Sequence, residues 1–327
     1  MHIKSIKHIT LFLILILGLG FQSNTKNPDI ESIKDDTITV MQNHYKERFR
    51  PQFHYTSKIN WFNDPNGLIK HKDLYHMYYQ YNPKGTQWGN MSWGHATSID
   101  LIHWKEHTVS FNMTDDMIFS GTTAIDSTND SGLYETENCI VAAYTSFEYE
   151  LDEKENINAI AQHQSIAVSN DEGYSFEHFE SNPVLNINSK EFRDPKIFKY
   201  DDEWIMLVSL ADQHKIAFYK SRDLKSWSEI SQFGNLGDTS SVWECPDLFP
   251  LKHNGETKWV LTLSAGHPQG NKFYAMQYFI GDFDGTSFTP DALNYPRYLD
   301  FGKDFYAGIT FANMNTDDFA TMIGWLG

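Results

Sequence analysis

Three short motifs, far apart along the chain, each contain a carboxylate residue: 61–67 (WFNDPNG), 193–198 (RDPKIF) and 243–249 (WECPDLF). In the first, Asn-Asp-Pro-Asn-Gly predicts a tight turn that fixes the side chain of Asp64. In the second, Arg193 precedes Asp194, and an ion pair between the two is a structural alternative to a catalytic role. In the third, Glu244 follows Trp243, so an apolar environment is expected to favour its protonated form.

Three such carboxylates suit hydrolysis of a glycosidic bond with retention, which needs a nucleophile and an acid/base about 5 Å apart. Asp64 is the candidate nucleophile, and Glu244, between Trp243 and Cys245, is the candidate acid/base. An ionised nucleophile disfavours ionisation of a neighbouring glutamate, which keeps that acid protonated. Asp194 would hold sugar hydroxyls most tightly as the oxocarbenium ion forms, and so would stabilise the transition state.

Residue types common in sugar sites accompany the first motif. Trp61 offers an aromatic surface, and residues 78–83 (YYQYNP) add the amide groups of Gln80 and Asn82. Apolar walls with a few placed polar groups are typical of small-molecule sites. Without these neighbours Asp64 would be an ordinary turn residue.

The elements that position these motifs are predicted to be strands. Short runs rich in aromatic and β-branched residues recur between turn residues, at 74–81, 139–147, 203–210 and 258–265. No amphipathic segment is long enough to predict a helix, so the expected fold class is all-β.

A weak repeat, Ser-x-Asp followed by an aromatic residue, refines this expectation. Its copies are Ser98/Asp100/Trp104, Ser169/Asp171/Phe176, Ser221/Asp223/Trp227 and a degenerate Asp284/Phe288. The aspartates are 71, 52 and 61 residues apart, a spacing that fits one four-stranded blade of a β-propeller. Four blades and part of a fifth are therefore predicted, although aspartate-rich turns also recur by chance in β proteins.

The amino-acid composition and net charge limit the classes of ligand that the protein is expected to bind. The 327 residues are 40% hydrophobic and 15% aromatic, which is enough for a core and favours strands. A net charge of −17 disfavours nucleic acid and anionic membrane surfaces, and leaves neutral sugars open. The 14 histidines show no metal-ligand spacing, so neither a metal nor a cofactor is expected.

The N-terminus predicts export. Residues 1–23, with two lysines before a short apolar run, indicate a signal peptide, and 24–44 a polar leader before a domain at 45–327. The run is shorter than the roughly 20 residues that span a bilayer, so a secreted or periplasmic protein is expected, without stable membrane insertion once the signal is removed. Cys139 and Cys245 are expected to be buried thiols, although one disulfide is possible.

Together with 119–126 (FSGTTAID) and 300–308 (DFGKDFYAG), the three motifs resemble glycoside hydrolase family 32, the invertases, levanases and inulinases. The resemblance runs from Phe53 to the end of the chain and implies a five-bladed β-propeller followed by a C-terminal β-sandwich. The chain stops just after Trp325, so the fifth blade is expected to be incomplete and the sandwich absent. Either a fragment of a longer product or a naturally short protein would fit.

Residue by residue, the resemblance implies that Asp64 is the nucleophile, Asp194 the transition-state stabiliser and Glu244 the acid/base. It also implies a fructose-binding subsite lined by Asn63, Gln80, Trp88, Ser120 and Arg193, with Trp61 and Trp325 as further substrate-facing residues. Two departures, Phe62 for the commoner Met and Thr122 for the commoner Ser, are conservative and leave the chemistry intact.

The stretch Met91-Ser92-Trp93 resembles fructan exo-hydrolases. The expected substrates are therefore levan or inulin, cut at the terminal β-linked fructose by double displacement, with sucrose also accepted. A sucrose-specific invertase remains an alternative. So does a non-catalytic fructan-binding propeller, because of the expected truncation. An inverting propeller acting on arabinose or xylose polymers would lack the first and third motifs.

Overall fold

A computed structural model of the chain describes residues 46–134, 139–266, 274–314 and 318–327. The chain divides into two compact units, Met1–Arg50 and Pro51–Gly327. The signal peptide and leader predicted at 1–44 lie outside the described residues. The described part of the first unit is a short segment that ends at Arg50, and in it Arg50 forms an ion pair with Glu47. None of the helices in the described part of the chain could cross a membrane.

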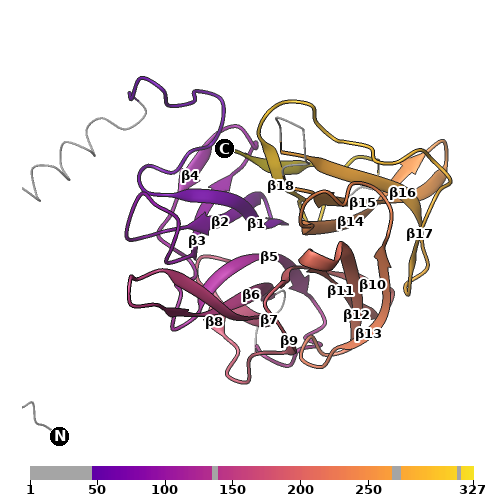
Figure 1. Cartoon of the computed structure of the whole chain (residues 1–327), viewed down its shortest axis with the longest axis horizontal. Helices are drawn as coiled ribbons and strands as arrows, with labels where there is room; N and C mark the ends of the chain where they lie inside the picture. The colour runs from indigo at the N-terminus through magenta and orange to yellow at the C-terminus, as the bar shows by residue number, and fades with distance from the viewer. Residues whose placement is uncertain (1–45, 135–138, 267–273, 315–317) are drawn as a thin grey trace, which may run out of the picture. The chain divides into compact units, whose positions relative to one another are not determined.

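The second unit is built from antiparallel sheets that follow one another along the chain (Figure 1). The first sheet has the order β1 (Phe62–His71), β2 (Leu74–Tyr81), β3 (Ser92–Ser98) and β4 (Trp104–Glu106). The second has β5 (Met117–Asp126), β6 (Cys139–Leu151), β7 (Ile157–Ser169) and β8 (Glu177–His178), and β9 (Leu185–Ser189) also pairs with β7.

The third sheet has the order β10 (Phe192–Tyr200), β11 (Glu203–Leu210), β12 (Lys215–Ser221) and β13 (Ser228–Gly234). The fourth has β14 (Glu244–His253), β15 (Glu256–Ser264), β16 (Met276–Phe283) and β17 (Phe288–Pro290), and a two-stranded sheet of β18 (Phe305–Thr310) and β19 (Met322–Leu326) follows. Within the described residues the only helical element is the 3₁₀ turn η1 (Ala211–Gln213).

The first strands of the successive sheets form a ring. β1 contacts β5, β5 contacts β10, β10 contacts β14, β14 contacts β18, and β18 contacts β1. Just after β18, the N–H of Ala312 donates to the carbonyl of Leu68 and that of Lys70 to Ala312, so backbone hydrogen bonds join the last sheet to the first. The fold is therefore an all-β propeller with four complete blades in the described residues, and the β18–β19 sheet takes part in its ring.

The predicted strands are confirmed, and the repeat has a structural meaning. In each of the four blades it forms the turn before the outermost strand, where the aspartate accepts backbone N–H groups, as Asp100 does from Ile102 and His103. The predicted tight turn at Asn-Asp-Pro-Asn-Gly was wrong, because these residues lie within β1, whose pairing with β2 is irregular on both sides of Pro65. Bulges rather than a turn shape this segment.

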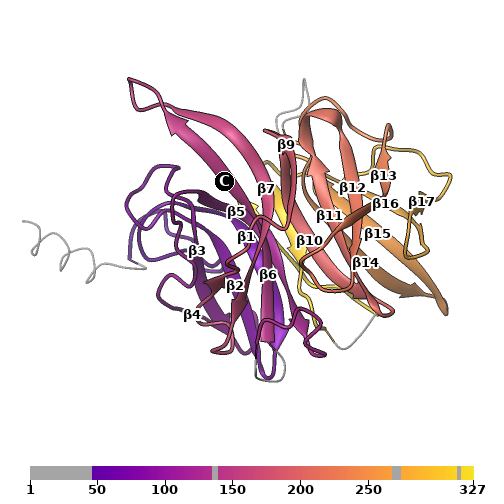
Figure 2. The same ribbon diagram turned by 90° about the horizontal axis from the view of Figure 1, so that it is seen from below.

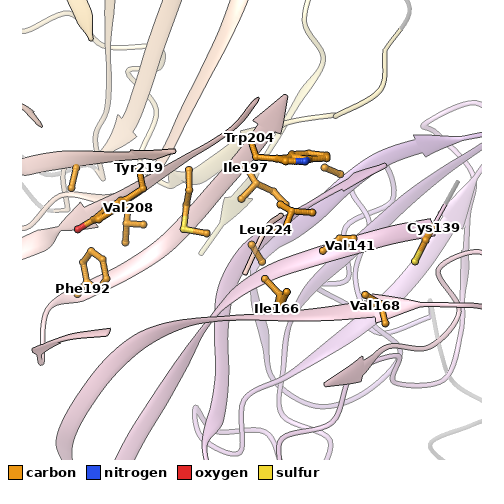
Figure 3. Packing of buried hydrophobic residues seen from close by; sticks show 14 of the residues in the cluster. Cys139, Val141, Ile166, Val168, Phe192, Ile197, Trp204, Val208, Tyr219 and Leu224 are labelled. Atoms are coloured by element: carbon orange, nitrogen blue, oxygen red, sulfur yellow. The ribbon is translucent and has the colours of Figure 1, made fainter. Parts of the chain in front are cut away.

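Side chains between the sheets hold the blades face to face, as expected for layers that must bury an apolar surface. Between the second and third sheets, Val141, Ile166 and Ile197 pack with Trp204 and other buried residues (Figure 3). Cys139 belongs to the same cluster, and both it and Cys245 are buried free thiols.

Side-chain hydrogen bonds also connect the inner strands. Thr122 of β5 accepts from the N–H of Ile197 and donates to the carbonyl of Pro195, both in β10. Next to it, a Cβ on Gly121 would lie 2.1 Å from the carbonyl oxygen of Ala143 in β6, so only glycine allows this close approach. The inner strands are thereby held in fixed register around the axis.

Candidate active site

Four of the inner strands bring the predicted carboxylates and their neighbours together. Asp64 lies near the start of β1, and Ser120 of β5 donates a 2.7 Å hydrogen bond from Oγ to its Oδ2. Asn63 donates from Nδ2 to Oδ1 of the same carboxylate, at 3.1 Å. Both oxygens of Asp64 therefore have donors, which fix its orientation and stabilise its ionised form.

Asp194 and Asp64 meet at Cys245. The backbone N–H of Cys245 donates to Oδ2 of Asp194 at 3.0 Å. The Cys245 thiol lies 3.6 Å from this oxygen and 3.8 Å from Oδ2 of Asp64. Asp194 and Cys245 both have positive φ, 64° and 48°, a costly conformation that aims their side chains and is often found at functional sites.

Glu244 opens the inner strand β14 and is oriented by two other strands. Nε and Nη2 of Arg193 both lie 3.1 Å from its Oε1, and the hydroxyl of Tyr306 donates to its Oε2. The predicted apolar surround was wrong for the carboxylate itself, because its partners are a guanidinium and a phenol. Trp243, which immediately precedes β14, is fully buried in the core between the third and fourth sheets.

The ion pair between Arg193 and Asp194, the structural alternative to a catalytic role, is the longest of the three contacts that Arg193 makes with carboxylates. Its Nε lies 4.0 Å from Oδ2 of Asp194, whereas its Nη1 contacts Glu191 and donates to Gln162. Arg193 therefore links Glu191 at the edge of the site with Glu244 inside it. Buried arginine with several carboxylate partners stays charged.

Burial and mutual repulsion disfavour full ionisation of the carboxylates. Burial raises the pKa of Asp64, the hydrogen bond from Ser120 opposes this, and the charge of Glu244 adds to the rise. Burial also raises the pKa of Asp194, which Arg193 opposes and both other carboxylates increase. Burial and the nearby negative charges therefore oppose ionisation of Asp64 and Asp194, whereas Ser120 and Arg193 favour it.

Some of the predicted sugar-binding residues make hydrogen bonds within the protein, whereas Trp88 is exposed to solvent. Trp61 donates from Nε1 to Asn63 at 2.8 Å and so supports the residue next to Asp64. Gln80 is buried and donates to the carbonyl of Ile118, so it also holds β5 in place. Trp88 is 43% exposed and packs edge-to-face on Phe119, so part of its side chain is open to solvent.

Trp325 lies on β19 and packs with Tyr274 and Tyr306. It also lines a cavity of about 270 Å³ together with Asn63 and Phe62, so it lies near the start of β1. A second, narrow cavity of about 10 Å³ is lined by Ser120, Asp194, Cys245 and other residues of the inner strands. All ten predicted site residues therefore belong to the inner strands or to segments in contact with them.

Sequence reasoning missed four residues that position the cluster. Tyr306 lies within the 300–308 motif, whose pattern marked the segment but gave the tyrosine no role. Thr145, whose Oγ1 accepts the N–H of Asp194 at 2.9 Å, lies in an ordinary strand pattern. Gln162 and Glu191, the further partners of Arg193, likewise belong to no motif.

Comparisons with known proteins assign the chain to a family. A family model described as the glycosyl hydrolases family 32 N-terminal domain matches residues 54–327. An extracellular exo-inulinase of Aspergillus niger is 40% identical over 312 residues, which cover 86% of this chain and 58% of the relative. A levanase of Bacillus subtilis is 41% identical over 295 residues, covering 86% of this chain and 42% of the relative.

Among solved structures, exo-inulinase from Aspergillus awamori superposes with a TM-score of 0.79 at 36% identity, covering 86% of this chain and 60% of that one. The chain thus spans about half the length of the curated relatives that it matches. The match to the family model includes all three carboxylate motifs. The chain belongs to glycosyl hydrolase family 32.

Proposed function

We propose that this protein is a retaining β-fructosidase that releases terminal β-linked fructose from fructans, and from sucrose as a smaller substrate. The observation that supports this most directly is the meeting of Asp64 and Asp194 at Cys245, with Glu244 held beside them by Arg193 and Tyr306. Relatives named as an exo-inulinase and a levanase support the same substrate class.

In the first step, an oxygen of ionised Asp64 attacks the anomeric carbon of the terminal fructose. The bond to the leaving sugar breaks, and Glu244 gives its proton to the departing oxygen. In the second step, Glu244 takes a proton from water, whose oxygen displaces Asp64 and regenerates the carboxylate. Retention of configuration follows from the two successive displacements.

The remaining residues serve these two carboxylates. Asp194 accepts hydrogen bonds from fructose hydroxyls. The hydrogen bond that it accepts from the backbone N–H of Cys245 holds its carboxylate in place for the transition state. Ser120 and Asn63 orient the nucleophile. Trp61, Gln80, Trp88 and Trp325, with Arg193, form the proposed fructose-binding subsite.

The propeller is proposed to have five blades, the fifth represented by the β18–β19 sheet. Support comes from the ring of inner strands, which closes through Ala312 and β1. Export is also proposed, on the charged and apolar pattern of residues 1–23 and on the extracellular location stated for the A. niger relative.

The experiment that tests the function is fructose release from levan, inulin and sucrose by the purified chain, beside its Asp64→Ala variant. Release that disappears in the variant supports the proposal and ranks the three substrates. No release from a chain shown by circular dichroism and a cooperative melt to be folded would contradict it. Proton NMR of early product should show the β anomer first; the α anomer would argue for inversion.

A further inference from the structure

The β6–β7 hairpin is the longest in the described structure, with 13 residues in each strand, and it extends past its neighbours in the sheet (Figure 2). Towards its tip, residues 147–151 read Phe-Glu-Tyr-Glu-Leu. Because side chains of a strand alternate between faces, Phe147, Tyr149 and Leu151 share one face and both glutamates lie on the other. Leu151 is 57% exposed, so the apolar face continues into solvent.

That apolar face is the one directed at the carboxylate cluster. Two residues before Phe147, on the same face, Thr145 accepts the backbone N–H of Asp194. The partner of Phe147 on β7 is Gln162, whose Oε1 accepts from Arg193 at 3.3 Å. The face therefore begins at the catalytic residues and runs outward from them.

A series of aromatic rings in contact runs from Trp88 to Tyr149 on the hairpin. Trp88 packs edge-to-face on Phe119, with centroids 5.9 Å apart. Phe119 and Phe147 are stacked with centroids 4.4 Å apart and planes 10° apart, and Phe147 and Tyr149 are stacked in the same way at 5.9 Å. Tyr149 ends the series, half-buried and next to exposed Leu151.

We infer that the face of the hairpin that carries Tyr149 binds the fructan chain beyond the fructose being cleaved, and so determines the preference for chain length. The inference rests on the proposed function for the identity of the ligand. A furanose ring has an apolar side that packs on an aromatic ring, and the Tyr149 hydroxyl can bond sugar hydroxyls at the same time. Sucrose, with one unit beyond the cleaved fructose, would reach this face less than a longer chain would.

The test compares wild type with Tyr149→Ala, Tyr149→Phe and, as a matched control on the opposite face of the same strand, Glu150→Ala. For each, kcat/KM is measured on sucrose and on inulin-type oligosaccharides of three to six units. In Tyr149→Ala the ratio of the value for the longest oligosaccharide to that for sucrose should fall about tenfold, the size expected for one lost stacking contact. Tyr149→Phe should recover most of the ratio, and Glu150→Ala should keep it.

An equal loss on every substrate, or an equal loss in Glu150→Ala, would overturn the inference while leaving the proposed hydrolysis intact. If the chain hydrolyses nothing, migration through gels containing inulin or levan gives a separate readout. Retardation that depends on Tyr149 would support the binding face although the hydrolytic function had failed. Unretarded migration of the wild type would overturn the inference. A Tyr149-dependent dimer seen by light scattering would overturn it too, because a second copy of the chain would then cover this face.

Discussion

Tyr306 donates its phenolic hydrogen bond to Oε2 of Glu244, across 62 positions of sequence, while Arg193 holds the other oxygen. Burial and the charge of Glu244 raise the pKa of Tyr306 well above its ordinary value, so the phenol remains a donor at all working pH values. Glu244 is thereby fixed in one rotamer, which a general acid needs to reach the leaving oxygen.

Removing this donor should weaken proton transfer without unfolding the protein. We expect Tyr306→Phe to lower kcat on sucrose by about tenfold, the scale of one lost hydrogen bond to a charged group. Activity on p-nitrophenyl fructoside should fall much less, because its leaving group needs little protonation. Glu244→Gln should show the same split more strongly; equal losses on both substrates would assign Tyr306 a merely structural role.

Ser120→Ala should change the pH dependence of the reaction. The Ser120 hydroxyl lowers the pKa of Asp64, so its removal leaves burial and the charge of Glu244 to raise that pKa further. Because the nucleophile must be ionised, the acidic limb of the kcat/KM profile should move to higher pH. Ser110→Ala, a change at another buried serine away from the carboxylates, is the control; an unmoved limb in Ser120→Ala would contradict the assignment.

A pair of buried histidines should make the fold sensitive to acid. Burial lowers the pKa of His95 to about 2 and that of His76 to about 4, from roughly 6.5 in the unfolded chain. As pH falls below about 6.5 the unfolded chain binds protons that the folded chain does not, so the free energy of unfolding decreases.

The measurement is urea unfolding at pH 7, 6 and 5 for wild type and His95→Phe. The variant should lose less stability on acidification, by at most about 1.4 kcal/mol per pH unit for one histidine. Asp64 and Asp194, whose pKa values are raised, act in the opposite direction in both proteins, so only the difference between them is informative. Parallel curves would show that His95 contributes nothing to the acid sensitivity.

The buried ion pair of Lys196 and Asp247 should be essential to the ring. Their charged atoms lie 2.8 Å apart, and Asp247 also accepts from the N–H and hydroxyl of Thr310 in β18. Lys196→Met leaves a buried carboxylate without its cation, which typically costs about 3 to 5 kcal/mol. Lys199→Met, which breaks a partly exposed pair with Asp130, should cost about 1 kcal/mol or less. Similar losses in urea unfolding would contradict a special role for Lys196.

The sequence by itself determined the strands, the blade repeat and the three carboxylate motifs, because alternation of side chains and turn chemistry are local properties. It indicated that Asp64, Asp194 and Glu244 belong to one site. It did not reveal that the NDPNG segment is a bulged strand, since its turn residues fit either conformation until pairing with β2 is known.

Only the tertiary structure decided how the carboxylates are held. The contacts of Cys245 with Asp64, of Arg193 with Glu244 and of Thr145 with Asp194 join residues 181, 51 and 49 positions apart. Such contacts depend on the order and register of inner strands from different blades, which no local pattern specifies. The burial and the partners of each carboxylate therefore follow from closure of the ring, and together they set the direction in which the pKa values of Asp64 and Asp194 are shifted.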